Sequence, residues 1–370
     1  MTADNPVRWE ADGDVLVITI DNPPVNALRL GVRVGIIAAI DALEADSSLV
    51  GAVMTGEGRA FIAGADITEF GKPPQDPNLN DAVYKIEGAS KPVVAAINGV
   101  ALGGGLEVAL GCHARVAHPK ARVGVPEVHL GLLPGAGGTQ RLPRVAGVEA
   151  ALDMTITGKH VPAPKAHAIG VVDAVADDCV DVAKDKARAL AAAGTWPVIA
   201  QMPNPSVPES FFDAARAQIE KKARGQMSPI LCLEAVKAAV ELPFAEGMDR
   251  ERELFVQGLT SDQSRGLIHA FFGEREVSKI PGLDPEAKPR EVKTAAIIGA
   301  GTMGGGIAMC FANAGIPVTV LEQTQEALDK GLGVCRKNYE NTAKKGRLTM
   351  EQVEERMALF TGTTDINDLA

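Results

Sequence analysis

Two glutamates that follow glycine-rich or turn-forming segments could carry out proton transfer. Glu107 comes soon after three consecutive glycines at 103–105, and Glu127 ends the segment Gly-Val-Pro-Glu. A third segment of this kind, Phe61-Ile-Ala-Gly-Ala-Asp66, lies upstream. Glycine lets the backbone approach a ligand closely, so these segments can offer N–H donors to an oxyanion while the carboxylates move protons. Together they supply what the addition of water to an activated double bond requires.

The spacing of apolar residues after the three glycines predicts a helix that begins at 103–105. Its apolar positions are Leu106, Val108, Ala109 and Leu110. A helix N-terminus adds a partial positive charge, which would favour negative charge on a substrate oxygen. When water adds to an activated double bond, such charge builds on the activating carbonyl oxygen, and loss of one N–H donor typically costs ~2.7–4 kcal/mol. Burial would raise the pKa of each carboxyl group toward neutrality, where it can exchange protons.

Strands and helices alternate in the first half of the chain. Short apolar runs predict strands at 15–20, 50–55 and 92–97, and helical spacing predicts helices at 31–45 and 78–90. This alternation is typical of βαβ units and a largely parallel sheet. From 100 to 188 the pattern continues with a glycine-rich turn, a helix, short strands and further helices.

The composition changes after this region. Prolines concentrate between Trp196 and Pro208, which indicates a linker, and 209–278 has the pattern of helices alone. A second linker, rich in proline and charge, spans 280–290, and a short buried strand follows at 294–298.

That strand leads into a dinucleotide-binding pattern, Gly299-x-Gly301-x-x-Gly304. It is followed by a predicted helix and a second strand at 318–321, which ends in Glu322, 18 positions after Gly304. A strand, a glycine-rich turn and a helix are the context in which this pattern binds a dinucleotide. Glu322 would hydrogen-bond the ribose hydroxyls and repel a 2′-phosphate, so NAD is favoured over NADP.

The order and spacing of these segments resemble known families. The segments around Ala65, Glu107 and Glu127, with the glycine-rich run 131–141, resemble the crotonase superfamily, and the presence of both glutamates resembles its enoyl-CoA hydratase branch. The segment from Lys293 is similar to the start of a 3-hydroxyacyl-CoA dehydrogenase. The chain as a whole therefore resembles the multifunctional enzymes of fatty-acid β-oxidation.

The resemblance implies an α/β fold in three parts. A crotonase ββα spiral would cover 1–190, a helical connecting region 191–290, and the N-terminal half of a Rossmann fold 291–370. The catalytic His–Glu pair of the dehydrogenase family lies further downstream in that family. We therefore expect hydratase activity from this chain and dehydrogenase activity only from a longer parent.

The resemblance also assigns roles. The backbone N–H groups of Ala65 and Gly104 would form the oxyanion hole. Glu107 and Glu127 would hold the water, with Glu127 transferring the C2 proton and Glu107 activating water, although this division stays open. We interpret Asp66 as a helix N-cap or a loop brace, and not as a base. An acyl-CoA would be the substrate, and isomerisation of a 3-enoyl double bond would be a side activity. A thiolase subunit is a candidate partner.

Two alternatives remain open from the sequence. One is an enoyl-CoA isomerase that uses only Glu127, because isomerisation needs no held water. The other is a non-catalytic module that binds acyl-CoA or NAD, although such a module has no need of two proton-transfer groups.

Net charge, cysteine and histidine spacing, and the absence of targeting signals exclude several classes of protein. A net charge of −10 argues against nucleic-acid binding. The five cysteines and six histidines lack metal-ligand spacing, so reduced thiols and no metal site are expected. We find no secretory signal, no run of apolar residues long enough for a membrane span, and no Ser-Lys-Leu ending. These observations favour a cytoplasmic location, and they leave the oligomeric state open.

Overall fold

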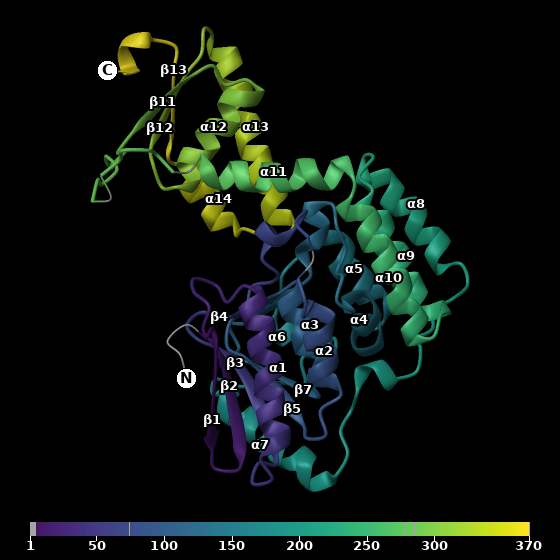
Figure 1. Ribbon diagram of the computed structural model, residues 1–370. Coiled ribbons are helices and arrows are strands. Elements are labelled where there is room, and N and C mark those ends of the chain that lie inside the picture. Colours follow the sequence, from purple (N-terminus) through teal and green to yellow (C-terminus); the bar gives the residue numbers. More distant parts are fainter. Residues whose placement is uncertain (1–4, 74, 278, 285, 370) are drawn as a thin grey trace. The chain divides into compact units, whose positions relative to one another are not determined.

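The computed structural model describes residues 5–73, 75–277, 279–284 and 286–369 (Figure 1). The chain divides into two compact units, Met1–Lys279 and Ile280–Ala370. Position 278, at the end of the predicted helical region, and position 285, in the predicted second linker, lie outside the described residues. So do positions 1–4 and 370, at the outer bounds of the predicted spiral and Rossmann parts.

A six-stranded sheet forms the base of the first unit, in the order β1-β2-β3-β5-β7-β10. Its strands are β1 (Val7–Asp12), β2 (Val15–Ile20), β3 (Gly51–Gly56), β5 (Val93–Ile97), β7 (Ala114–Ala117) and β10 (Ala174–Val175). β1 and β2 pair antiparallel, and every later pair in this sheet is parallel. Every residue of β3, β5 and β7 is buried, as expected for parallel strands covered on both faces.

A second sheet has the order β4-β6-β8-β9. Its strands are β4 (Ala60–Ile62), β6 (Val100–Leu102), β8 (Arg122–Gly124) and β9 (Val161–Pro162). Successive turns of the chain therefore give one strand to the first sheet and the next strand to the second. This arrangement confirms the predicted spiral, and it brings the ends of β4, β6 and β8 together at the place where the candidate residues follow.

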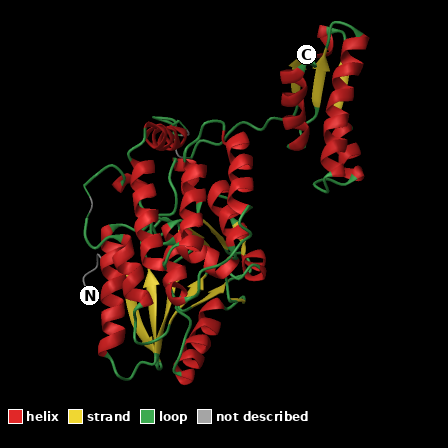
Figure 2. Cartoon of the chain, turned by 90° about the vertical axis from the view of Figure 1, so that its right-hand side faces the viewer, coloured by secondary structure: helices red, strands yellow, loops and turns green. Residues whose placement is uncertain are grey.

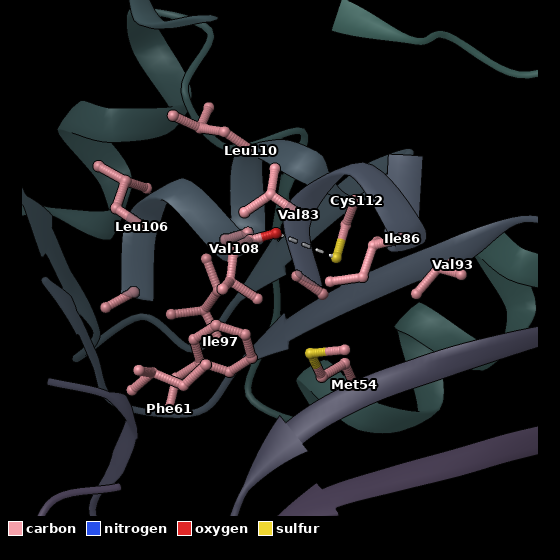
Figure 3. Packing of buried hydrophobic residues seen from close by; sticks show 14 of the residues in the cluster. Met54, Phe61, Val83, Ile86, Val93, Ile97, Leu106, Val108, Leu110 and Cys112 are labelled. Atoms are coloured by element: carbon pink, nitrogen blue, oxygen red, sulfur yellow. Dashed lines mark hydrogen bonds between the residues drawn. The ribbon is translucent and has the colours of Figure 1, made fainter. Parts of the chain in front are cut away.

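Helices cover both faces of the first sheet (Figure 2). On one face lie α1 (Leu30–Ala45), α2 (Leu79–Glu87) and α3 (Gly104–Gly111), whose apolar side chains meet those of the strands in the main core. Figure 3 shows Phe61, Ile97 and Val108 converging there. On the other face lies α7 (Cys179–Ala193), which packs Cys179, Ala183 and Ala187 against the sheet.

The predicted helical region is helical as expected. It contains α8 (Phe211–Ala223), α9 (Ser228–Glu241), α10 (Phe244–Leu259) and α11 (Asp262–Glu276). Helices α9 and α10 pack on α4 (Gly138–Ala146), and α9 also packs on α5 (Val148–Thr157). Leu231 and Ala235 of α9 share a buried cluster with Leu133 from the loop before α4. These helices consequently belong to the same compact unit as the spiral.

The second unit is built on a parallel three-stranded sheet, in the order β11-β12-β13. Its elements are β11 (Ala295–Ile298), α12 (Thr302–Asn313), β12 (Val318–Leu321), α13 (Gln325–Lys344), α14 (Met350–Met357) and β13 (Phe360–Thr363). The predicted strand, glycine-rich turn, helix and second strand all occur, which confirms the N-terminal half of a Rossmann fold. Ile298, at the end of edge strand β11, is 74% exposed.

Candidate active site

The turn between β6 and α3 places a backbone directly against Glu127. Gly103 caps α3 with φ 52° and ψ −128°, a conformation that L-amino acids with side chains rarely adopt. A Cβ atom at Gly103 would lie only 2.7 Å from Glu127 Oε1. Both the backbone conformation and the lack of space therefore require glycine at this position.

The two predicted oxyanion donors lie in neighbouring backbone segments. Ala65 follows β4 and forms an isolated parallel bridge with Leu28, whose N–H donates to Gly64 O at 2.9 Å. Gly104 is the first residue of α3, and a Cβ atom on it would lie 3.6 Å from Ala65 N. The first N–H groups of a helix have no partner within it, so Gly104 N–H is available to a ligand. The structure thus brings Ala65 and Gly104 together.

Asp66, next to Ala65, has a structural role. Its side chain accepts a hydrogen bond from Thr68 N at 2.9 Å and caps η1 (Ile67–Glu69). It also forms an ion pair with Arg29 at 2.7 Å. The predicted helix N-cap is confirmed, and the carboxylate is occupied by these partners.

Glu107, one turn into α3, is held by the backbone of a second helix N-terminus. Its Oε1 accepts from Ala136 N at 2.7 Å and from Gly138 N at 2.8 Å. The residue is only 2% exposed. Burial raises the pKa of the Glu107 carboxyl group, although the two N–H donors and the Arg141 charge oppose this. Because both bonds end on Oε1, Oε2 is the oxygen that can act on a ligand.

Glu127 lies on η2 (Pro126–Leu130), directly after β8. The residue is partly exposed, but its Oε2 atom is buried and has no hydrogen-bond partner among the described residues. Burial raises the pKa of Glu127 well above its usual value, and repulsion from Glu107 and Glu251 raises it further. A buried oxygen without a partner is uncommon, and it is free to accept a hydrogen bond from a water or a ligand.

The two carboxyl groups can therefore share one proton. Repulsion between the two carboxylates makes it costly to ionise both. Glu107 has the N–H donors that stabilise a carboxylate, and Glu127 has the more strongly raised pKa. The two carboxyl groups therefore differ in how readily they ionise.

A third buried carboxylate, Glu251, reaches the same loop from α10. Its Oε1 accepts from Gly137 N at 2.7 Å, and its Oε2 accepts from Thr139 N at 3.0 Å and from Thr139 Oγ1 at 2.5 Å. The sequence analysis did not single out this residue. A signal was present, because Glu251 falls on the buried stripe of α10 with Met248 and Leu254, where an apolar residue is expected.

Arg141 supplies the positive charge near these carboxylates. It is fully buried and makes a two-point ion pair with Glu87, at 3.0 and 2.8 Å. Its guanidinium also lies over the rings of Tyr84 and Phe244, at 5.9 and 5.0 Å from their centroids. Arg141 Nη1 donates to Ala136 O at 3.2 Å, which ties this residue to the loop that holds Glu107.

The second unit brings its predicted residues to one turn. Gly299 has φ 94°, and a Cβ atom at Gly304 would lie 1.8 Å from Gly299 O, so the turn and α12 are in close contact. Gly301 caps α12, and Glu322 Oε1 accepts from Ala300 N at 2.6 Å. A hollow of about 450 Å³ lies here, lined by Gly299, Glu322 and six neighbours from β11, β12 and the segment after β13. A further hollow of about 710 Å³ lies against α5, α8 and α9, and the two catalytic candidates do not line it.

Each of the two units matches a known family model. Residues 10–230 match the family model described as enoyl-CoA hydratase/isomerase. The chain belongs to this family. Residues 294–370 match the NAD-binding domain of 3-hydroxyacyl-CoA dehydrogenase, which confirms the second predicted family. In the part of the chain that the structure describes, no helix is long and apolar enough to cross a membrane.

Curated relatives align with most of this chain. The peroxisomal bifunctional enzyme of Danio rerio is 43% identical over 339 residues, 90% of this chain and 47% of the relative. A peroxisomal fatty acid β-oxidation multifunctional protein of Arabidopsis thaliana is 36% identical over 96% of this chain and 52% of its own length. The chain thus spans about half the length of the curated relatives it matches. Because these relatives carry a peroxisomal name, the cytoplasmic location remains only a prediction.

A solved structure supports the fold of the first unit. The enoyl-CoA hydratase from Mycobacterium avium subsp. paratuberculosis superposes with a TM-score of 0.53 at 25% identity. The superposition covers 73% of this chain and 96% of that protein.

Proposed function

We propose that this chain adds water to trans-2-enoyl-CoA to give 3-hydroxyacyl-CoA. The observation that carries the proposal is the pairing of two buried carboxyl groups with different surroundings. Glu107 Oε1 is fixed by two N–H donors, while Glu127 Oε2 is buried without a partner among the described residues. Hydration needs one group that accepts a proton from water and one that delivers a proton to carbon.

The reaction follows from this geometry. The thioester oxygen accepts hydrogen bonds from Ala65 N and Gly104 N, which stabilise the negative charge that develops on it. As the water oxygen bonds to C3, the Glu107 carboxylate takes one water proton. The electron pair of the double bond moves to C2, where it takes the proton of Glu127. The excess proton on Glu107 then returns to Glu127 through solvent, and the pair regains its starting state.

Isomerisation of 3-enoyl-CoA to 2-enoyl-CoA is a second activity that the site supports. It needs one group that removes a proton from C2 and returns it to C4, and the raised pKa of Glu127 suits that group to exchange protons. Incubation with 3-enoyl-CoA should yield the 2-enoyl product, and this conversion should persist in Glu107→Gln. If Glu107→Gln abolishes both reactions equally, the single-residue route for isomerisation is wrong.

Hydration is tested by following the loss of enoyl-thioester absorbance of crotonyl-CoA. Glu107→Gln and Glu127→Gln should each lower kcat by at least about 100-fold, because each removes one proton-transfer group. Glu149→Gln, an exposed glutamate of α5, is the matched control and should retain the activity of the wild type. A folded wild-type protein that is inert on short and long enoyl-CoAs would refute the proposal.

The second unit fits NAD. Gly299, Gly301 and Gly304 allow the close turn at the start of α12, and Glu322 stands at the end of β12 beside it. When bound, NAD accepts a hydride, and the 3-hydroxyacyl thioester made by the first unit carries such a hydride. We propose that Glu322 accepts hydrogen bonds from the ribose hydroxyls of NAD. We also propose that a longer parent protein oxidises the 3-hydroxyacyl thioester. NAD should protect this unit from proteolysis at concentrations where NADP does not. Glu322→Gln should reduce the difference between the two dinucleotides.

A further inference from the structure

Four successive backbone N–H groups are shared alternately between two glutamates. The N–H groups of Ala136 and Gly138 donate to Glu107, and those of Gly137 and Thr139 donate to Glu251. The two carboxylates come from different helices, α3 and α10, and both accept from the segment 136–139, which includes the first two residues of α4. Glu251 is 1% exposed and takes no part in the proposed reaction.

The shared N–H groups stand at the N-terminus of α4. The first N–H groups of a helix lack partners within it, and leaving a buried donor without an acceptor is destabilising. Glu251 satisfies two of them, so it fixes the direction of the peptide units at 137 and 139. These peptide units are joined covalently to those at 136 and 138, so fixing them restrains the N–H groups that hold Glu107.

Further hydrogen bonds connect Glu251 to the neighbouring helix α9. Thr139 Oγ1 donates to Glu251 and accepts from Gln140 Nε2 at 2.9 Å, and the same Nε2 donates to Ala235 O of α9. Every oxygen of the carboxylate therefore acts as an acceptor. Helices α9 and α10 thus have a hydrogen-bonded connection to the loop that carries the donors of Glu107.

We infer that Glu251 is a positioning residue for hydration, which holds Glu107 in place through the shared turn 136–139. The inference rests on the proposed function of the Glu107–Glu127 pair. It extends the site beyond the spiral, because the residue comes from a helix that the sequence analysis placed in a separate connecting region. Glu251 does not touch the reacting atoms in this scheme.

Charge gives Glu251 a second influence on the pair. Burial and repulsion from Glu107 raise the pKa of Glu251 to about 8, against the hydrogen bonds from Thr139 and Gly137 and the charge of Arg141. When Glu251 is ionised, its charge adds to burial and to repulsion from Glu107 in raising the pKa of Glu127. Removing that charge should therefore lower the pKa of Glu127.

The test compares Glu251→Gln with the wild-type full chain in hydration of crotonyl-CoA. The amide keeps one acceptor but turns an N–H donor toward the turn, so Glu107 moves. A displacement of order 1 Å lowers rates by as much as ~100-fold. We expect kcat to fall about 10- to 100-fold with KM within threefold, and the alkaline limb of the kcat profile to move to lower pH. Glu253→Gln, an exposed neighbour on α10, is the matched control and should change neither.

The outcomes are separable. If the wild type is inert, the proposed function falls, and the inference falls with it. If the wild type is active and folded Glu251→Gln has unchanged kcat and pH profile, Glu251 is only a structural support and the inference alone is overturned. Should Glu251→Gln not fold, Thr139→Val decides: a folded variant with kcat reduced several-fold supports the inference, and unchanged kcat overturns it.

Discussion

Replacing Gly103 by alanine tests whether the turn before α3 sets the position of the Glu127 carboxylate. The new Cβ atom would lie 2.7 Å from Glu127 Oε1 and 3.3 Å from its Cδ. A separation under 3.0 Å requires a shift, and the side chain of Glu127 yields more readily than the backbone of β6 and α3. The substitution therefore displaces a proposed proton donor without altering its chemistry.

The magnitude has two parts. Alanine in the Gly103 conformation, φ 52° and ψ −128°, costs about 1–3 kcal/mol of folding stability. The steric contact acts on the reaction instead. Misplacing a catalytic group by about 1 Å can cost ~100-fold in rate, equivalent to ~2.7 kcal/mol of barrier. A displacement of several tenths of an ångström should accordingly lower kcat by roughly 10- to 100-fold.

Gly58→Ala separates these two effects. Gly58 also has a positive φ, +73°, but no atom lies within 4 Å of the position a Cβ would take. Urea unfolding should show a loss of stability in both variants, whereas the crotonyl-CoA assay should show a large loss of kcat only in Gly103→Ala. Equal kcat values in the two variants, or full activity in Gly103→Ala, would refute the steric reasoning.

Three further predictions concern the protonation of Glu107 and Glu127, the length of chain that hydration requires, and the buried Arg141. In the reaction Glu107 must be ionised, which sets the acid limb of the kcat–pH profile, and Glu127 must be protonated, which sets the alkaline limb. Because the pKa of each group is raised, both limbs should lie above the usual pH range of carboxyl groups. Initial rates measured across pH test this. A chain ending at Lys279 should retain hydration, whereas one ending at 208 lacks α10 and should lose it, as crotonyl-CoA turnover will report. Arg141→Met should lower the free energy of unfolding by about 3–5 kcal/mol, measured in urea, because it leaves the Glu87 carboxylate buried without its partner.

Each of these has its own control. In the pH series, Glu127→Gln should abolish the alkaline limb, and an unchanged limb would assign it to another group. For the shortened chains, circular dichroism must show a folded spiral, and an active chain ending at 208 would contradict the need for α10. The surface pair of Arg250 and Glu253 provides a comparison for Arg141, since breaking an exposed pair costs about 1 kcal/mol or less.

Local patterns predicted the parts of the site that depend on a turn and the residues just after it. Glu107 lies one turn into α3, and its position follows from the glycines that begin that helix. Glu127 likewise follows directly from the end of β8. In the second unit, Gly299 and Glu322 are both fixed by the ends of adjacent parallel strands. Such positions depend only on short segments of the chain, so residue types and their spacing are enough to predict them.

Glu251 could not be predicted in this way, because its partners are set by packing between distant segments. Its carboxylate meets Gly137 and Thr139 only because α9 and α10 pack on α4. The proline-rich stretch before α8 indicated a boundary, whereas the helices after it return to the spiral and share one compact unit with it. Strand β13 was also not predicted, since its short sequence, Phe-Thr-Gly-Thr, has little apolar alternation and pairs through β12.

The order of strands in the first sheet has a consequence for biosynthesis. From β2 onward, each strand pairs with one made earlier, so the spiral can fold turn by turn as the chain leaves the ribosome. Glu251, however, is translated long after Glu107. At about 5–20 residues per second, the interval between them is on the order of ten seconds. Nascent chains should therefore gain the folded spiral first and an ordered catalytic loop only later, when α10 has emerged.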